Sequence, residues 1–167
     1  MKYILLIVAV ALMYVSCEEE KFDYYTGEEY IRLVPSVFDA PSFKYERTLN
    51  FAQYSYKDTV CLIDVEVIGG VSSQPRQVKF EQMIVDESQK QAMPGVLFVP
   101  FDDPAMLAKM ILPADSVRAK IPIRVLCNRD TLNKYASSPG IRLNFKIVES
   151  EGLKVLPKYS TGCITLR

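Results

Sequence analysis

Residues 59–68, TVCLIDVEVI, decide the fold. Every second residue from Cys61 to Val67 is apolar, while Asp64 and Glu66 lie at intervening positions. Alternation with a period of two places the two sets on opposite faces of an extended chain. Two glycines follow the run and end it. The stretch therefore predicts a β-strand with one face in a core and one polar face.

Similar runs, separated by turn residues, lie on both sides of this strand. They predict further strands at 30–34, 43–51, 78–84, 96–101, 117–127, 141–148 and 160–167. Their alternation places the following side chains toward the core: Phe43, Tyr45, Leu49, Phe51, Val78, Phe80, Ile84, Ile121, Ile123, Val125, Cys127, Ile141, Leu143, Phe145 and Ile147. Pro122 interrupts one run and predicts an edge strand or a bulge there.

One helical turn is predicted inside this pattern. Asp103 is suited to cap it, Pro104 to occupy its first position, and residues 105–110 continue it. The polar segment 128–140 has room for a short helix near Leu132. About seven strands without a long amphipathic helix are typical of a β-sandwich. We therefore expect an all-β chain with one immunoglobulin-like sandwich over residues 28–167.

The N-terminus has the pattern of a secretory signal. Lys2 precedes an apolar run over residues 3–15, and the small residue Ser16 precedes Cys17. The run is shorter than the roughly 20 residues that a membrane span needs. We expect a signal peptide over residues 1–16. An ordinary signal peptide followed by a chance cysteine is the alternative.

Tyr14-Val15-Ser16-Cys17 resembles the bacterial lipobox, although lipoboxes favour Leu where Tyr14 stands. The resemblance implies lipidation of Cys17, which would anchor the chain to a membrane through buried CH₂ groups. Residues 17–27 would form the lipidated tether. Their acidic run, 18–20, resembles the surface-export signal of Bacteroidetes lipoproteins, and a solvated tether is the other interpretation. The expected location is the outer membrane, at the cell surface.

The composition excludes several classes of function. The chain contains no histidine, which rules out Ser-His-Asp and Cys-His catalysis and removes the commonest zinc ligand. Lys and Arg number 20, as do Asp and Glu, and no basic block stands out, so nucleic-acid binding has no support. We expect no cofactor, and we assign no catalytic or metal-binding residue.

Three cysteines remain besides Cys17: Cys61, Cys127 and Cys163. An odd number leaves at least one free thiol unless it pairs between chains. Their long spacing and the absence of a C-x-x-C motif suggest neither a metal knuckle nor a redox motif. Cys61 and Cys127 continue apolar alternations, which favours buried thiols acting as small hydrophobic groups. One disulfide is the alternative.

Acidic residues could support two kinds of chemistry, glycoside hydrolysis and calcium binding. Two carboxylates about 5–10 Å apart can hydrolyse glycosides, and the pairs Asp64–Glu66 and Asp102–Asp103 are candidates. Same-face strand carboxylates are usually solvated, however, and an Asp before Pro is better explained as a helix cap. Calcium needs six to eight oxygen ligands. The loop acids are scattered, with no calcium-loop motif: Asp58, Asp102, Asp103, Asp115 and Asp130.

Tyr54 and Tyr56 are the best lead for a binding surface. They lie two residues apart, and thus on one face of an extended segment, at the parity opposite Phe51. Exposed tyrosine rings there could stack on sugar rings, because each offers a flat apolar face with a polar tip. The alternative is that they cover a sheet edge or pack under a loop.

Several stretches together resemble a family of Bacteroidetes lipoproteins catalogued only as a domain of unknown function. They are the tyrosine-rich tether ending at Tyr30-Ile31, then Asp64-Val65-Glu66-Val67-Ile68-Gly69, Met93-Pro94-Gly95-Val96-Leu97-Phe98, Leu112-Pro113-Ala114-Asp115-Ser116 and Ile121-Pro122-Ile123-Arg124-Val125. The middle region is also similar to calcium-exchanger β repeats, which are immunoglobulin-like. The chain departs from the family by an extra turn over residues 102–110.

This resemblance implies a cell-surface lipoprotein beside SusC- and SusD-type glycan-uptake genes, with those outer-membrane proteins or a glycan as partners. It brings no established activity or site. The leading hypothesis is a non-enzymatic accessory binding component of a glycan or nutrient uptake system. The alternatives are a structural or adhesive protein-interaction module without glycan affinity, and a hydrolase that uses two carboxylates.

Overall fold

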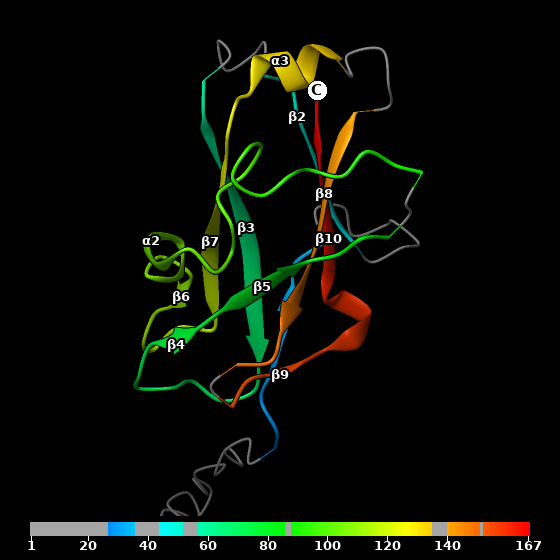
Figure 1. The fold of residues 1–167 in the computed structure, drawn as a ribbon. Helices are drawn as coiled ribbons and strands as arrows, with labels where there is room; N and C mark the ends of the chain where they lie inside the picture. The colour runs from blue at the N-terminus through cyan, green and yellow to red at the C-terminus, as the bar shows by residue number, and fades with distance from the viewer. Residues whose placement is uncertain (1–26, 36–43, 52–56, 86–87, 135–139, 151) are drawn as a thin grey trace, which may run out of the picture.

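The computed structural model describes residues 27–35, 44–51, 57–85, 88–134, 140–150 and 152–167. Two four-stranded sheets lie face to face, and a two-stranded ribbon flanks them (Figure 1). The expected signal peptide lies outside the described residues. So does the expected tether with Cys17, except for its last residue, Gly27. Three further residues with predicted positions also lie outside: Phe43, Tyr54 and Tyr56.

The first sheet is built around β3 (Thr59–Ile68), the strand that the alternating stretch predicts. Its neighbours are β7 (Arg118–Val125) on one side and β1 (Tyr30–Leu33) on the other, with β9 (Lys154–Val155) beyond β1. β9 runs parallel to β1, whereas the other pairs are antiparallel. Cys61, Ile63, Val65 and Val67 are buried, as expected.

The second sheet has the order β2-β10-β8-β5. It consists of β2 (Tyr45–Leu49), β10 (Thr161–Leu166), β8 (Ile141–Val148) and β5 (Lys79–Gln82). β2 and β10 are parallel, while β8 pairs with both β10 and β5 in antiparallel register. Alternate residues of β8 from Ile141 to Ile147 are buried, which confirms the predicted core face.

The first two strands belong to different sheets. β1 pairs with β3 and β9 in the first sheet, and β2 pairs with β10 in the second. The N-terminal segment therefore ties the two sheets together. Of the ten strands in the described residues, seven have four or more residues, which agrees with the expected number. The chain is an all-β protein with an immunoglobulin-like sandwich.

Short elements complete the fold. They are β4 (Arg76–Gln77), α2 (Pro104–Leu107), β6 (Ile111–Leu112), α3 (Arg129–Lys134) and η2 (Pro157–Tyr159). β4 and β6 form the ribbon. The predicted cap of α2 is confirmed, because Asp103 Oδ1 accepts hydrogen bonds from the Ala105 and Met106 amides at 2.9 and 3.2 Å. The short helix near Leu132 is α3.

The predicted strand over residues 96–101 is wrong. The chain turns there, because the Gly95 amide donates to the Phe98 carbonyl at 2.8 Å and the Leu97 amide donates to Met93 at 2.9 Å. Gly95 has a φ of 77°, a left-handed conformation that suits glycine, and Pro100 cannot donate to a ladder. The segment keeps only isolated bridges among the described residues, from Phe98 to Pro94 and from Phe98 to Val125.

Two predicted core residues also differ. Ile84 is 73% exposed, because β5 ends at Gln82 and the alternation no longer applies beyond it. Cys127 lies past the end of β7 and is only partly buried. Pro122, by contrast, lies in β7, an edge strand of the first sheet, which confirms the expected edge position.

Candidate functional site

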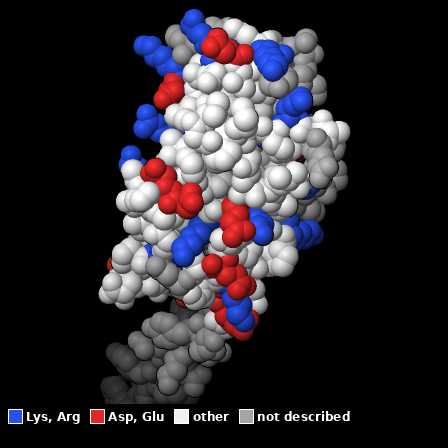
Figure 2. All heavy atoms as spheres, in the orientation of Figure 1, with Lys and Arg blue, Asp and Glu red and all other residues white. Residues whose placement is uncertain are grey.

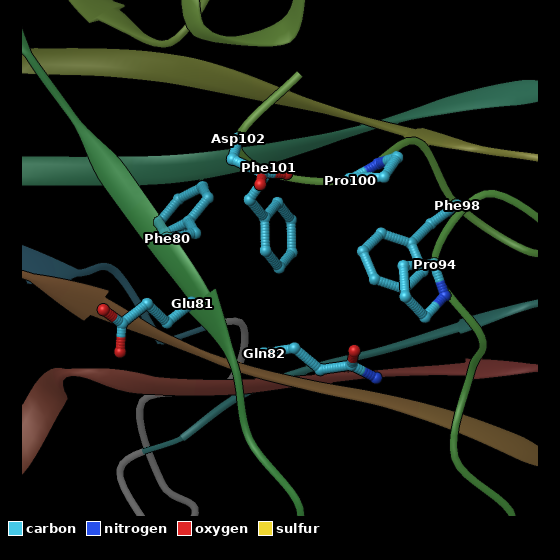
Figure 3. Close-up of a pocket in the computed structure, with 8 residues that line it drawn as sticks. All are labelled: Phe80, Glu81, Gln82, Pro94, Phe98, Pro100, Phe101 and Asp102. Carbon is cyan, nitrogen blue, oxygen red and sulfur yellow. The ribbon is translucent and has the colours of Figure 1, made fainter.

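A cavity of about 360 Å³ opens at the free edge of β5 (Figure 3). Three consecutive residues of β5 form one wall, and the turn that replaces the predicted strand over residues 96–101 forms the other. We call this cavity the edge groove. It is lined by Phe80, Glu81, Gln82, Pro94, Phe98, Pro100, Phe101 and Asp102. Its volume lies within the range of about 300–1,000 Å³ that small-molecule sites occupy.

The floor of the edge groove is aromatic. The Phe101 ring lies 5.8 Å from Phe80, edge to face, and 5.2 Å from Phe98, measured between centroids. Phe80 also contacts Phe145 of the central core at 5.3 Å. The cluster therefore joins the groove to the core, and its rings are fixed by packing from several sides.

The rim of the edge groove has polar side chains, Gln82 and Asp102, beside two prolines, Pro94 and Pro100. Gln82 Nε2 donates to the Ala92 carbonyl at 2.7 Å, which fixes the carboxamide beside Pro94 (Figure 3). Asp102 is exposed. Glu81 points away from the rings and pairs with Lys146 at 3.1 Å. The groove thus offers an apolar floor with one amide and one carboxylate near it.

Asp64 and Glu66 share the outer face of β3, as the alternation predicts, but Glu66 is held by two arginines. One oxygen accepts hydrogen bonds from Arg32 Nε and Nη2 at 2.9 and 2.5 Å. The other accepts from Arg118 Nε and Nη2 at 2.8 and 2.5 Å. Burial alone would raise the pKa of Glu66, but these hydrogen bonds and charges lower the pKa below its ordinary value. A carboxyl held ionised in this way is poorly suited to act as a general acid.

The remaining predicted acids do not gather at one site within the described residues, although Asp102 and Asp103 are adjacent in the chain. Asp103 caps α2, and its neighbour Asp102 lines the edge groove. Asp58 accepts a hydrogen bond from the Cys127 amide at 2.9 Å and lies 3.5 Å from Arg124. Within the part of the chain that the structure describes, no three Asp, Glu or Cys side chains gather as metal ligands would.

Cys61, Cys127 and Cys163 are free thiols, so none of the three forms the alternative disulfide. The expected burial is confirmed for Cys61, whereas Cys127 is only partly buried. Cys61 is fully buried in the core, whereas Cys163 is part-exposed and alternates with the buried Ile164. Burial raises the pKa of all three thiols. Thiols with raised pKa values are weak nucleophiles at neutral pH.

Sequence reasoning missed the edge groove and one buried arginine. Arg76 of β4 is 6% exposed, and its neighbours in the sequence give no sign of burial. The groove depends on a turn and a sheet edge that lie far apart in sequence. A Pro-Gly pair near a second proline, Pro94-Gly95 and Pro100, was the available signal for that turn.

Figure 2 shows charged side chains of both signs interspersed on one face, with a broad area between them that carries neither. This distribution agrees with the net charge of zero. Among the described residues, no helix is long and apolar enough to cross a bilayer.

The described residues form an immunoglobulin-like β-sandwich with a cavity at one sheet edge. No known family model matches this chain, and no curated protein matches it. Among solved structures, the apo form of the Calx CBD1 domain is 15% identical, covering 84% of this chain and 99% of that one, with a TM-score of 0.47.

A structural-genomics protein of unknown function from Bacteroides ovatus is 14% identical to this chain, with a TM-score of 0.50. The match covers 82% of this chain and 46% of that one. At this identity the similarity shows the fold alone.

Proposed function

We propose that this chain is a surface-anchored, non-enzymatic lipoprotein and an accessory binding component of a glycan or nutrient uptake system. Its lipid would be on Cys17, and its β-sandwich would bind glycan. The lipobox-like stretch ending at Cys17 and the resemblance to lipoproteins of glycan-uptake loci support this placement. The edge groove is the observation that carries the binding function.

The chemistry of the edge groove suits a sugar. A pyranose ring has apolar C–H faces, which pack against aromatic carbon such as that of Phe80 and Phe101. Its hydroxyl groups need hydrogen-bonding partners at fixed positions, and Gln82 and Asp102 supply an amide and a carboxylate beside the rings. A wholly apolar ligand would make no use of the Gln82 carboxamide oxygen or of the Asp102 carboxylate.

The strand register supports an arrangement in which an N-terminal anchor would lie at the end of the sandwich where β1 begins. Tyr30, the first residue of β1, pairs with Ile68 at the end of β3. Thr59 begins β3 nine residues earlier, about 30 Å away at 3.4 Å per residue. A tether over residues 17–27 would span at most about 40 Å. An N-terminal anchor would thus leave the Thr59 end and the sheet edges facing outward.

Binding of the detergent-solubilised full chain to a panel of glycans tests this proposal. We expect saturable binding that Asp102→Ala combined with Gln82→Ala abolishes. Glu81→Gln is the matched control, because its carboxylate points away from the groove, and it should bind normally. Loss of binding in Tyr54→Ala/Tyr56→Ala alone would assign the site to the two tyrosines. Absence of binding across the panel would refute glycan recognition.

The anchor is tested separately by expressing Cys17→Ala in the native host. We expect wild-type protein in the outer-membrane fraction and at the surface, accessible to added protease, and the variant in the soluble fraction. Unchanged membrane fractionation of the variant would contradict lipidation at Cys17.

A structural or adhesive module is the second candidate, and the outer face of β3 favours it. Val60, Leu62 and Ile68 are 52, 42 and 40% exposed on this face. Exposed apolar side chains on a sheet are suited to a protein partner. This function predicts reproducible co-purification with an envelope complex, lost in Val60→Lys/Leu62→Lys, and no glycan affinity.

A further inference from the structure

Arg76 is a buried arginine in which three of the five N–H donors, one on Nε and two on Nη2, have no partner within the described chain. Its Nη1 donates to Glu29, and its side chain is 7% exposed. Its Nε and Nη2 are buried and have no hydrogen-bond partner within the described chain. Leaving buried charged donors unsatisfied is costly, so native structures rarely do so without a reason.

Two other arginines show what this edge of a guanidinium binds in the same protein. Arg32 and Arg118 each direct Nε and Nη2 together at one carboxylate oxygen of Glu66. The Nε–Nη2 edge matches a carboxylate in geometry and charge. Arg76 presents the same edge with no carboxylate on it.

A cavity of about 610 Å³ adjoins Arg76, at the end of the sandwich where β1 begins. Its walls are Glu29, residues 71–76 and Gly152. Residues 71–75 belong to no strand, so the shift of this wall that a ligand would need in order to reach the buried Nε and Nη2 would break no ladder. It would cost the hydrogen bond that the Asp115 amide donates to the Ser72 carbonyl at 2.8 Å. Ser73 and Gln74 add a hydroxyl and an amide to the rim.

The charges around Arg76 favour some anions over others as ligands of this cavity. Glu29 already neutralises Arg76, and the neighbouring Glu28 pairs with Lys154. A dianionic phosphate would meet two carboxylates, whereas a monoanionic carboxylate meets less repulsion. Hydroxyl groups on the ligand would meet the polar rim.

We propose that this cavity is a binding site for the carboxylate of a small hydroxylated acid, such as a uronate, held by the Nε–Nη2 edge of Arg76. The site is separate from the edge groove and does not depend on the glycan-uptake function. Because the wall must shift, we expect a dissociation constant on the order of 1 mM.

Calorimetric titration of the detergent-solubilised full chain with glucuronate tests the site. Glucose is the neutral matched ligand, and methyl phosphate tests the charge argument. We expect saturable binding of glucuronate, at least ten-fold weaker binding of methyl phosphate, and no binding of glucose. Equal signals for glucuronate and glucose would overturn the proposal. A buried water on Arg76 Nε would give that result.

Three variants assign the binding to Arg76. Arg76→Lys keeps the charge but loses the two-donor edge, and it should weaken glucuronate binding at least ten-fold. Arg32→Lys is the control, because the Nε and Nη2 groups of Arg32 already donate to Glu66, and this variant should bind glucuronate normally. Glu29→Gln removes the competing carboxylate and should tighten binding about three-fold or more, which serves as the test if Arg76→Lys does not fold. Unchanged or weaker binding in Glu29→Gln would contradict the site.

Discussion

Gly162 of β10 lies directly opposite Phe145 of β8, and a methyl group on Gly162 would come within 2.5 Å of Phe145 Cζ. The Phe145 ring therefore occupies the space that any other residue at position 162 would need. The same ring contacts Tyr45, Phe80 and Phe101. The absence of one side chain in β10 thus lets the aromatic cluster extend from the core to the edge groove.

Gly162→Ala should destabilise the protein by about 1–3 kcal/mol, because the added methyl group forces Phe145 out of its packed position. Urea unfolding followed by circular dichroism measures the change. Gly70→Ala is the control, since its methyl group would meet only one side-chain oxygen, Oε1 of Glu29, at 3.1 Å, and it should destabilise the protein less. Equal losses in the two variants would contradict the packing explanation.

Glu66→Gln should lower the free energy of unfolding by about 1–2 kcal/mol at pH 7, because it removes the carboxylate that Arg32 and Arg118 share. The expected loss of stability is modest because the Arg118 side chain is 72% exposed, so that water and salt screen its ion pair with Glu66.

The effect should depend on pH in one direction. A carboxyl with a lowered pKa in the folded state adds stability above its ordinary pKa of 4.5, and that stability is lost as pH falls through the lowered value. The difference in the free energy of unfolding between Glu66→Gln and the wild type should therefore disappear in strong acid. Asp64→Asn, on the same strand face, is the control at pH 7 and should change the free energy of unfolding less than Glu66→Gln does. A difference that persists at pH 2 would rule out this linkage.

Asp103→Ala should lower the free energy of unfolding by about 1 kcal/mol, because it removes the acceptor for two backbone amides at the start of α2. Asp103→Asn keeps an oxygen at the cap and should retain most of the stability. Thermal unfolding compares the two variants. If both lose the same amount, the contribution comes from charge and not from the cap.

Iodoacetamide should modify the three described cysteines at different rates at pH 8. Cys61 is fully buried and its pKa is raised by burial, so it should react only after unfolding. Cys127 and Cys163 are part-exposed and should react slowly in the folded protein. Mass spectrometry of modified peptides gives the rates. Fewer than three reactive thiols in denaturant, Cys17 aside, would indicate a disulfide.

Local pattern was enough to predict most of the sandwich. β3 and β8 follow from alternation alone, because each has one face in the core over eight or more residues. The cap on α2 follows from Asp103 and Pro104, since the interactions lie within four residues. Predictions of this kind succeed where a few adjacent residues contain the whole physical cause.

Predictions failed where the cause lies elsewhere in the chain. The apolar run over residues 96–101 looks like a strand, but it buries Phe98 and Phe101 from a turn held against β7 and β5. The burial of Arg76 depends on Glu29, 47 residues away, and no local signal marks it. The edge groove combines the same kinds of distant partners, so it could not be read from one stretch.

The position of β1 between two neighbours has a mechanical consequence. If the chain is anchored through Cys17 while its outer end holds a ligand, tension enters at Tyr30 and runs along the strand axis. β1 is bonded to β3 on one edge and to β9 on the other. A pull along that axis loads the hydrogen bonds of both edges in shear, at the same time, and does not unzip them one by one. Under that anchoring, β1 would resist a force applied at Tyr30 through both of its neighbours.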